Sequence, residues 1–229
     1  MKNNACIPLV FLCLLTGCVT ETIPPADIYT ILPEWGNSKT QTEGQTNSSL
    51  TIKLAQVRAP GAITGTEILY TDAHYGRNSY AYSRWNDAPS ILMQTLFQVA
   101  LEESGLFKAV VPPTSVAETD LLLESTLLDL SHHVKDDGTS EGVIRVRFYL
   151  IDNKTDTVSA TQAFVSRVPA STKNAQGAVE ALNQAATKVA HQLVNWLAEP
   201  GKLLNQSTKC SASIPANCHQ QANDINQGQ

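Results

Sequence analysis

The sequence has no apolar run near its start that is long enough to cross a bilayer as a helix. A membrane-spanning helix needs about 20 predominantly apolar residues, whereas the run from Ile7 to Leu15 has nine. This run follows Lys2, as the apolar core of a secretory signal peptide follows a basic start. We interpret the segment as a targeting signal and not as part of a folded domain.

The sequence also lacks the clustered basic residues of a nucleic-acid-binding protein and the motifs of familiar enzymes. Its 16 Lys and Arg residues are scattered singly and are outnumbered by 21 Asp and Glu residues, which gives a net charge of −5. A protein that binds phosphate backbones needs a concentrated basic face. No nucleophile elbow, phosphate-binding loop or pair of catalytic carboxylates occurs at a recognisable spacing. We therefore expect no nucleic-acid binding, no catalysis and no cofactor.

A cysteine follows small residues directly after the apolar run. The segment Leu15 to Cys18, with the sequence Leu-Thr-Gly-Cys, is similar to the lipobox of bacterial lipoproteins. The similarity implies that residues 1–17 are removed as a lipoprotein signal peptide and that the mature chain begins at lipidated Cys18, whose acyl chains anchor it to a bilayer. The residue after Cys18 is Val19 and not Asp, which resembles the lipoproteins that are sorted to the outer membrane. A plain secretory signal is the alternative.

Few cysteines remain once this signal is removed. Of the five in the sequence, two lie within residues 1–17 and Cys18 would carry lipid, which leaves Cys210 and Cys218. In an oxidising compartment such a pair is expected to form a disulfide. A metal site that combines both cysteines with His219 is the alternative, although zinc sites usually draw four ligands from tighter spacings.

Hydrophobic periodicity predicts a single α+β domain at residues 28–199. Alternation with period two indicates half-buried strands, and apolar residues every three or four positions indicate helices. Residues 120–130 are apolar on both sides and should form a central strand, and the last two strands should form a long antiparallel hairpin. The expected strands are 29–32, 50–54, 67–70, 79–85, 108–111, 120–130, 144–151 and 157–168, and the second helix is expected at 174–198.

The first helix is expected to start after Trp85. Asp87 could cap its first turn, Pro89 fits an early helical position, and Gly105 is placed to end it. Its broad apolar stripe should pack on the sheet, although such a stripe could also bind a partner.

Polar segments flank and interrupt the predicted domain. Residues 18–27 form a short tether, which would hold the domain within about 36 Å of its anchor at 3.6 Å per residue. Residues 36–49 carry no large apolar side chain and are typical of a loop. Residues 200–229 are rich in Asn, Gln and Ser, so we expect a disordered tail.

Aromatic residues gather between residues 70 and 85. We predict that Tyr80, Tyr82 and Trp85, beside Tyr70 and Tyr75, include partner-binding residues, because aromatic side chains supply rigid contact area at little entropic cost. The alternative is that they are half-buried on the sheet.

One group of residues could suggest a metal site. Asp129, His132, His133, Asp136 and Asp137 lie close in sequence, and imidazole and carboxylate are good ligands for divalent metals. Lys135 and Gly138 sit among them, so we favour a solvated strand end followed by a turn, without metal.

In their order, these features resemble the auxiliary lipoproteins of ABC-type transport systems, which are partners of mammalian-cell-entry (MCE) proteins that carry lipids across the periplasm. The resemblance implies a mixed, mostly antiparallel sheet covered on one side by two helices. The segments that carry it are Cys18, Tyr29 to Leu32, Arg84 to Pro89, Val146 to Asp152, Thr157 to Phe164, Ala178 to Asn183, and Trp196-Leu197.

The resemblance also implies a function. The expected protein is a non-enzymatic lipoprotein of the outer membrane that faces the periplasm and tethers an MCE-type conduit, with its ABC transporter complex, to that membrane. Self-association is left open. The alternatives are a lipoprotein activator of a cell-wall synthase, which would need a longer tether than residues 18–27, and a metal-dependent periplasmic enzyme that uses His132 and His133.

Overall fold

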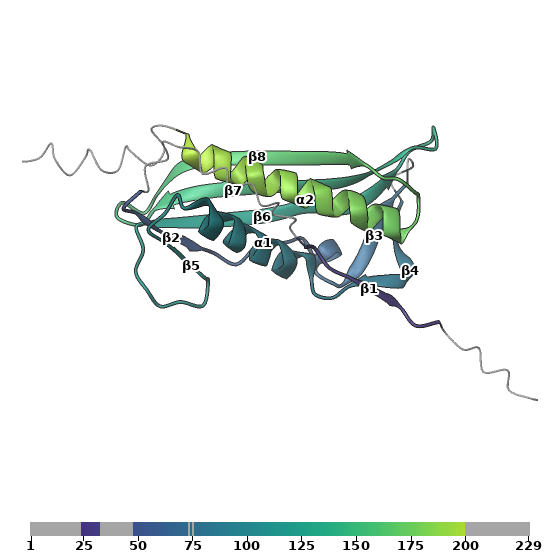
Figure 1. Ribbon diagram of the computed structural model, residues 1–229, viewed down its shortest axis with the longest axis horizontal. Helices are drawn as coiled ribbons and strands as arrows, with labels where there is room; N and C mark the ends of the chain where they lie inside the picture. The colour runs from purple at the N-terminus through teal and green to yellow at the C-terminus, as the bar shows by residue number, and fades with distance from the viewer. Residues whose placement is uncertain (1–23, 33–47, 73, 75, 200–229) are drawn as a thin grey trace, which may run out of the picture.

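The computed structural model describes residues 24–32, 48–72, 74 and 76–199. In this part of the chain, one mixed sheet of eight strands is covered on one side by two helices, which confirms the predicted α+β class (Figure 1). The predicted signal peptide, Cys18, most of the predicted 36–49 loop, Tyr75, and the predicted tail with Cys210 and Cys218 lie outside the described residues.

The strands follow the predicted order, and several have different ends. The first lies at 27–29 instead of 29–32, and the sixth continues to Val134. The strands are β1 (Asp27–Tyr29), β2 (Thr51–Leu54), β3 (Glu67–Thr71), β4 (Arg77–Trp85), β5 (Ala109–Val111), β6 (Leu121–Val134), β7 (Ser140–Asp152) and β8 (Thr157–Pro169). The helices are α1 (Pro89–Ser104) and α2 (Ala175–Ala198), with a short 3-10 turn, η1 (Gly61–Ile63), after β2.

Strand β6 is the centre of the sheet, as its apolar sequence predicts. On one side it forms the long antiparallel ladder with β7, which in turn pairs with β8. Two short strands pair in parallel with the other edge of β6. Strand β2 pairs with its residues Leu121 to Leu123, and β3 pairs with its residues His132 and His133. Strands β4 and β1 extend the sheet beyond β3, and β5 extends it beyond β2.

The core lies between the helices and one face of β6, β7 and β8. Along β7, Ile144, Val146, Phe148 and Leu150 are fully buried, whereas the intervening Arg145 and Arg147 are exposed. Strict alternation of this kind is expected for a strand with one covered face.

An aromatic group joins the sheet to both helices in this core. The Phe148 ring of β7 meets Phe97 of α1 edge-on at 5.0 Å between centroids, and it lies 6.5 Å from the Trp196 ring of α2. Phe164 of β8 completes the group, with its centroid 6.4 Å from that of Trp196. Such offset and edge-on pairs add to the free energy of burying the rings.

The helix ends confirm two predicted signals, Gly105 and Pro89, and correct one, and they show a cap on α2 that was not predicted. Gly105 ends α1 in the left-handed conformation with φ 63°, and the Asn174 side chain caps α2 by accepting a hydrogen bond from the Gly177 N–H at 3.0 Å. Pro89 is the first residue of α1, as predicted. Asp87 is not the N-cap, because that position falls to Ala88, and the Asp87 carboxylate accepts instead from the Ala88 N–H at 2.7 Å.

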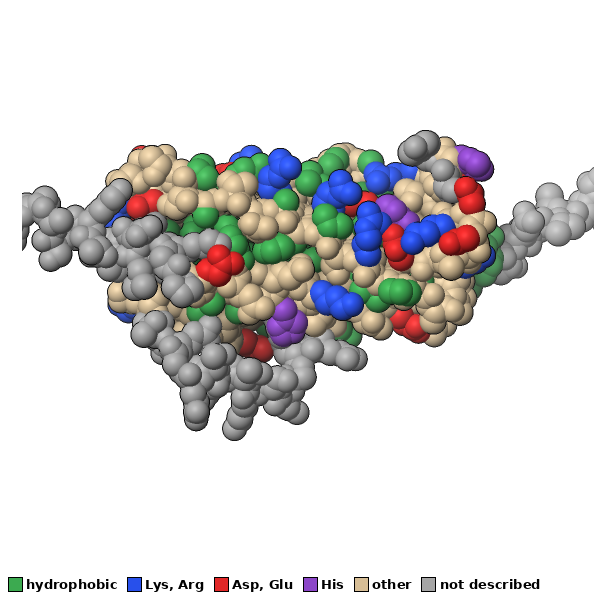
Figure 2. Space-filling model, turned by 90° about the horizontal axis from the view of Figure 1, so that it is seen from above, with side chains coloured by type: hydrophobic (Ala, Val, Ile, Leu, Met, Phe, Trp, Pro, Cys, Tyr) green, Lys and Arg blue, Asp and Glu red, His purple; other side chains and the backbone are tan. Residues whose placement is uncertain are grey.

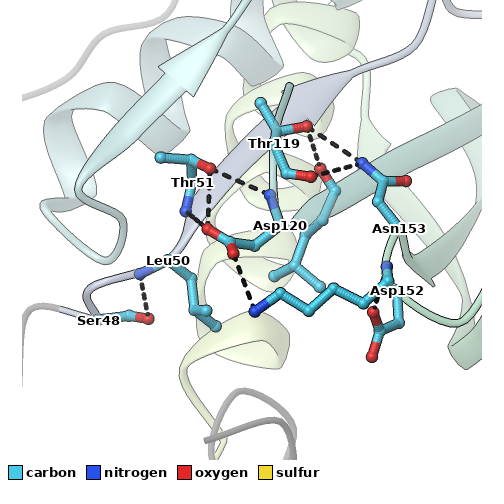
Figure 3. A network of polar contacts seen from close by, with 9 residues as sticks. Ser48, Leu50, Thr51, Thr119, Asp120, Asp152 and Asn153 are labelled. Atoms are coloured by element: carbon cyan, nitrogen blue, oxygen red, sulfur yellow. Dashed lines mark hydrogen bonds and ion pairs between the residues drawn. The ribbon is translucent and has the colours of Figure 1, made fainter. Parts of the chain in front are cut away.

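A polar network fastens the end of the sheet where β2 and β6 begin (Figure 3). One oxygen of Asp120 accepts from both the backbone N–H and the hydroxyl of Thr51, each at 2.9 Å, and its other oxygen lies 3.4 Å from the Lys154 ammonium. The Thr51 N–H bond is the largest cause of the lowered pKa of Asp120. Asn153, at the turn after β7, donates to the Thr119 carbonyl at 2.9 Å. The network joins three segments that are distant in sequence.

Helix α2 crosses β7 at close range because Gly142 has no side chain. A Cβ atom at this position would lie 2.8 Å from the backbone carbon of Ala181 and from the backbone nitrogen of Leu182. Neither backbone atom can move without shifting the whole helix, so a larger residue here must displace α2.

We expect Gly142→Ala to lower the free energy of unfolding by roughly 1–3 kcal/mol, the usual range for overpacking a core. Urea-unfolding curves would measure it. Gly61→Ala is the matched control, because its Cβ would meet no atom within 4 Å. Equal stability of the two variants would contradict the close approach of α2 to β7.

Candidate functional site

A surface cavity of about 320 Å³ lies where the start of α2 meets β1 and β4. Tyr80 and Tyr82, the two tyrosines that we predicted to bind a partner, line this cavity. Backbone and side chains from three segments that are far apart in the sequence complete its wall: Asp27 and Tyr29 from β1, Ala81 and Ser83 from β4, and Asn174, Ala175 and Gln176 at the start of α2.

Strand β4 places its three predicted partner-binding residues in three different environments. Tyr82 is 52% exposed, Tyr80 is half-buried, and Trp85 is only 2% exposed. From Tyr82 to Trp85 exposed and buried residues alternate along β4, so Trp85 lies on the opposite face of the strand from Tyr82. Trp85 is a core residue and offers no surface to a partner, which corrects the expectation for this residue.

Tyr80 is held in place by contacts inside the protein. Its hydroxyl lies 2.7 Å from Nδ1 of His132 and also donates to the Lys173 carbonyl at 3.3 Å. Its ring packs against Tyr70 with 5.0 Å between centroids. Burial, and secondarily the neighbouring Tyr70, raise the pKa of Tyr80 to about 12, so the phenol is neutral at physiological pH. Tyr80 therefore shapes the cavity wall as a fixed group.

His132 and His133 point to opposite faces of β6 and cannot share a metal ion. The His132 side chain is completely buried beside Tyr80, and its Nε2 atom has no hydrogen-bond partner in the described part of the chain. The His133 Nε2 atom instead lies 3.0 Å from the Asp129 carboxylate. Among the described residues, no group of three or more His, Cys, Asp and Glu side chains could hold a metal ion. We predicted from the sequence that this segment is a solvated strand end followed by a turn. The prediction is wrong for His132, which is buried, and it holds for Asp136 and Asp137, which lie in an exposed turn.

Exposed apolar side chains lie beside the cavity on the first strand. Ile28 is 62% exposed and is paired in register with Arg84, two residues from Tyr82 on β4. Leu32, just beyond β1, is 68% exposed. Strand β1 pairs only with β4 among the described strands, so its other edge is open. Together, Ile28, Leu32 and Tyr82 form what we call the β1 surface.

Asn183 of α2 fixes this first strand to the body of the fold. Its side-chain oxygen accepts from the Leu32 N–H at 2.8 Å, and its side-chain nitrogen donates to the Thr30 carbonyl at 3.1 Å. The residues that follow β1 are thereby held against a helix that lies about 150 positions later in the chain. The β1 surface thus has a fixed position on the domain.

The sequence analysis missed Ile28 and Leu32 as surface residues. Leu32 lies in the predicted strand 29–32 and Ile28 directly before it, and a large apolar residue of a strand usually points into the core. Only the position of β1 at the edge of the sheet leaves them exposed. No pattern in the sequence distinguishes such an edge strand from an interior one.

We expect the buried His132 to make the folded state less stable in mild acid. Burial, and then the nearby His133, lower the pKa of His132 below its usual value. The unfolded chain therefore binds more protons below about pH 6.5, so this contribution to stability is complete above pH 6.5 and is lost as the pH falls toward the folded-state pKa. His132→Gln should flatten the decline in unfolding free energy between pH 7 and pH 5.

Urea unfolding at the two pH values measures this effect. The unmodified protein, measured at the same two pH values, is the control. A decline in His132→Gln as steep as in the unmodified protein would show that His132 is not responsible.

The described helices include none that is both long enough and apolar enough to cross a membrane. No curated protein matches the sequence. Among solved structures, a protein from Xanthomonas campestris is similar with a TM-score of 0.67 and 18% identity, over 80% of this chain and 99% of the other. A second crystal structure gives a TM-score of 0.58 with 13% identity, over 76% of this chain and 99% of the other. A hypothetical protein from Chlamydia trachomatis gives 0.50 with 7% identity, over 69% and 99%. At these identities the likeness shows a shared fold.

The family comparison is more specific. Residues 29–194, from the last residue of β1 to near the end of α2, match the ABC-type transport auxiliary lipoprotein component. The match covers most of the chain and includes β4, the start of α2 and Asn183, but it begins after Asp27 of the cavity wall and Ile28 of the β1 surface. The protein belongs to the family of ABC-type transport auxiliary lipoproteins.

Proposed function

We propose that this protein is a non-enzymatic accessory subunit of an MCE/ABC-type lipid transport system, anchored in the outer membrane through lipid on Cys18. In this role it tethers the periplasmic conduit to the membrane. The observation that carries the proposal is the family match over residues 29–194, which follows a lipobox at Leu15 to Cys18.

The distance between anchor and fold supports a tethering role. Strand β1 begins at Asp27, nine residues after Cys18. At about 3.6 Å per residue this linker spans roughly 30 Å at most. Since Asn183 fixes the chain just after β1 to α2, the lipid would hold the whole domain near the bilayer. A partner that docks on it would meet a high effective concentration of binding sites at the membrane.

The β1 surface is the docking site we propose for the conduit protein. Exposed Tyr82, with Ile28 and Leu32, offers aromatic and aliphatic area beside an open strand edge, and Tyr80 shapes the adjoining cavity. Aromatic side chains are enriched among residues that dominate binding energy. The β1 surface lies next to the tether, so it would be near the anchored end of the chain.

The anchor makes one prediction. The mature protein should begin at Cys18, carry acyl chains and sediment with outer membranes, whereas Cys18→Ser should retain residues 1–17 and carry no lipid. Mass spectrometry of the native protein and membrane fractionation measure both. Cys13→Ser, inside the signal, should be processed as the unmodified protein is. An unacylated mature amino terminus would remove the basis for tethering.

The docking surface makes another. We expect Tyr82→Ala to weaken binding to the purified periplasmic part of the MCE protein from the same organism by about 30-fold or more, the loss of about 2 kcal/mol that defines an interface hot spot. Biolayer interferometry measures the dissociation constant, and thermal melting should be unchanged because Tyr82 is exposed. Val158→Ala is the control, since Val158 is a 58% exposed residue at the start of β8, a strand that pairs with neither β1 nor β4 among the described strands. If neither variant nor the unmodified protein binds, the proposed partner is wrong.

A further inference from the structure

The face of the sheet that α1 and α2 do not cover carries a row of charged side chains. On β7, Arg145 and Arg147 point to this face, and Tyr149 follows them two residues later. Strand β7 lies between β6 and β8, so these residues sit in the middle of the long three-stranded ladder. We call this the open face.

Every acidic side chain of the open face in the described β6 and β7 segments already has a basic partner. The Asp129 carboxylate lies 3.5 Å from Arg77 through one oxygen and 3.0 Å from His133 through the other. Glu141 likewise contacts two basic side chains, Lys135 and Arg167. Glu124 contacts one, Arg58.

Arg145 and Arg147 are left over by these pairs. In the part of the chain that the structure describes, neither forms an ion pair, and both are exposed. Arg147 lies between Thr126 and Ala163 on the neighbouring strands. Arg145 lies between Asp129 and Val165, but Ser131, Arg77 and His133 already occupy the Asp129 oxygens.

The open face is therefore positive on a protein whose net charge is −5. Figure 2, seen from the β8 side, shows Lys and Arg side chains gathered over one half of the visible face, with acidic, histidine and hydrophobic side chains among them. Apolar groups also accompany the free arginines, since Val165 is 45% exposed directly across from Arg145. Arg, Tyr and an aliphatic neighbour form the composition typical of the centre of a protein interface.

We propose that the open face, through Arg145 and Arg147, binds an acidic surface of the periplasmic protein that the β1 surface engages. This inference rests on the proposed function. Guanidinium groups pair with carboxylates through two parallel hydrogen bonds, which gives geometric specificity as well as attraction.

An anionic membrane fits this face less well than a protein does. Glu124, Asp129 and Glu141 lie on it and would be brought against lipid phosphates. Attraction to a charged leaflet supplies only about 1 kcal/mol for each Arg, so two free arginines give weak binding. A protein partner can place its carboxylates at Arg145 and Arg147 and avoid the three acids.

The test is to reverse both charges in the mature, lipidated protein and to measure its binding to the purified periplasmic part of the MCE protein at several salt concentrations. Arg145→Glu with Arg147→Glu should weaken binding at least about tenfold at low salt and reduce the salt dependence. Lys108→Glu with Lys188→Glu is the matched control. Lys108 directly precedes β5 and Lys188 lies on α2. Both are exposed, and neither forms an ion pair in the described segments. This control should bind within about twofold of the unmodified protein.

The outcomes separate the two proposals. If the unmodified protein binds and the arginine variant binds equally well, the open face is not the site, and the proposed function stands. If the unmodified protein does not bind, the partner is wrong and both proposals fall. A parallel flotation assay uses vesicles of phosphatidylethanolamine with one-fifth phosphatidylglycerol. Binding to these vesicles that depends on Arg145 and Arg147, with unchanged protein binding, would assign the face to lipid and overturn the inference.

Discussion

The packing of α2 across one face of β6, β7 and β8 is the interaction on which the rest of the fold depends. Gly142 lets the helix backbone approach β7, and a row of small residues on α2, including Ala178, Ala185 and Ala186, lies fully buried against the sheet. Close approach brings Phe148 and Trp196 into the same layer, where Phe97 of α1 joins them. The hydrophobic effect and dense packing both favour this arrangement over any in which α2 stands away from the sheet.

A sheet covered on one side leaves two surfaces that no other described segment of the chain covers. One is the open edge and exposed apolar residues of β1, and the other is the open face of the long hairpin. The first is close in sequence to Cys18, and the second carries two arginines with no acidic partner among the described residues. The two surfaces differ in chemistry, one aromatic and aliphatic and the other cationic, so a single partner could use both and gain specificity from their separation.

Polar groups buried beside the first of these surfaces hold it in shape. The Tyr80 hydroxyl and His132 Nδ1 share a hydrogen bond under the cavity wall, and Asn183 joins the end of β1 to α2. A buried polar group without its partner is destabilising, so these contacts favour one arrangement of β1, β4 and the start of α2. A docking site with a fixed shape loses less entropy on binding than a mobile one.

By itself, the sequence determined the elements and their order, the α+β class and the family. Local patterns carry this information: period two along β7 and β8, apolar residues every three or four positions in α2, Gly105 after α1, and Asn174 before α2. Only the tertiary structure decided which of the patterned residues are buried. Alternation along β4 puts Tyr82 and Trp85 on opposite faces, but only the packing of the core against one of these faces buries Trp85, and the place of β1 at the sheet edge exposes Ile28. His132 lies inside because a bulge after Leu127 resets the alternation along β6. Register, bulges and edge positions depend on contacts between residues far apart in the chain, and local periodicity does not contain them.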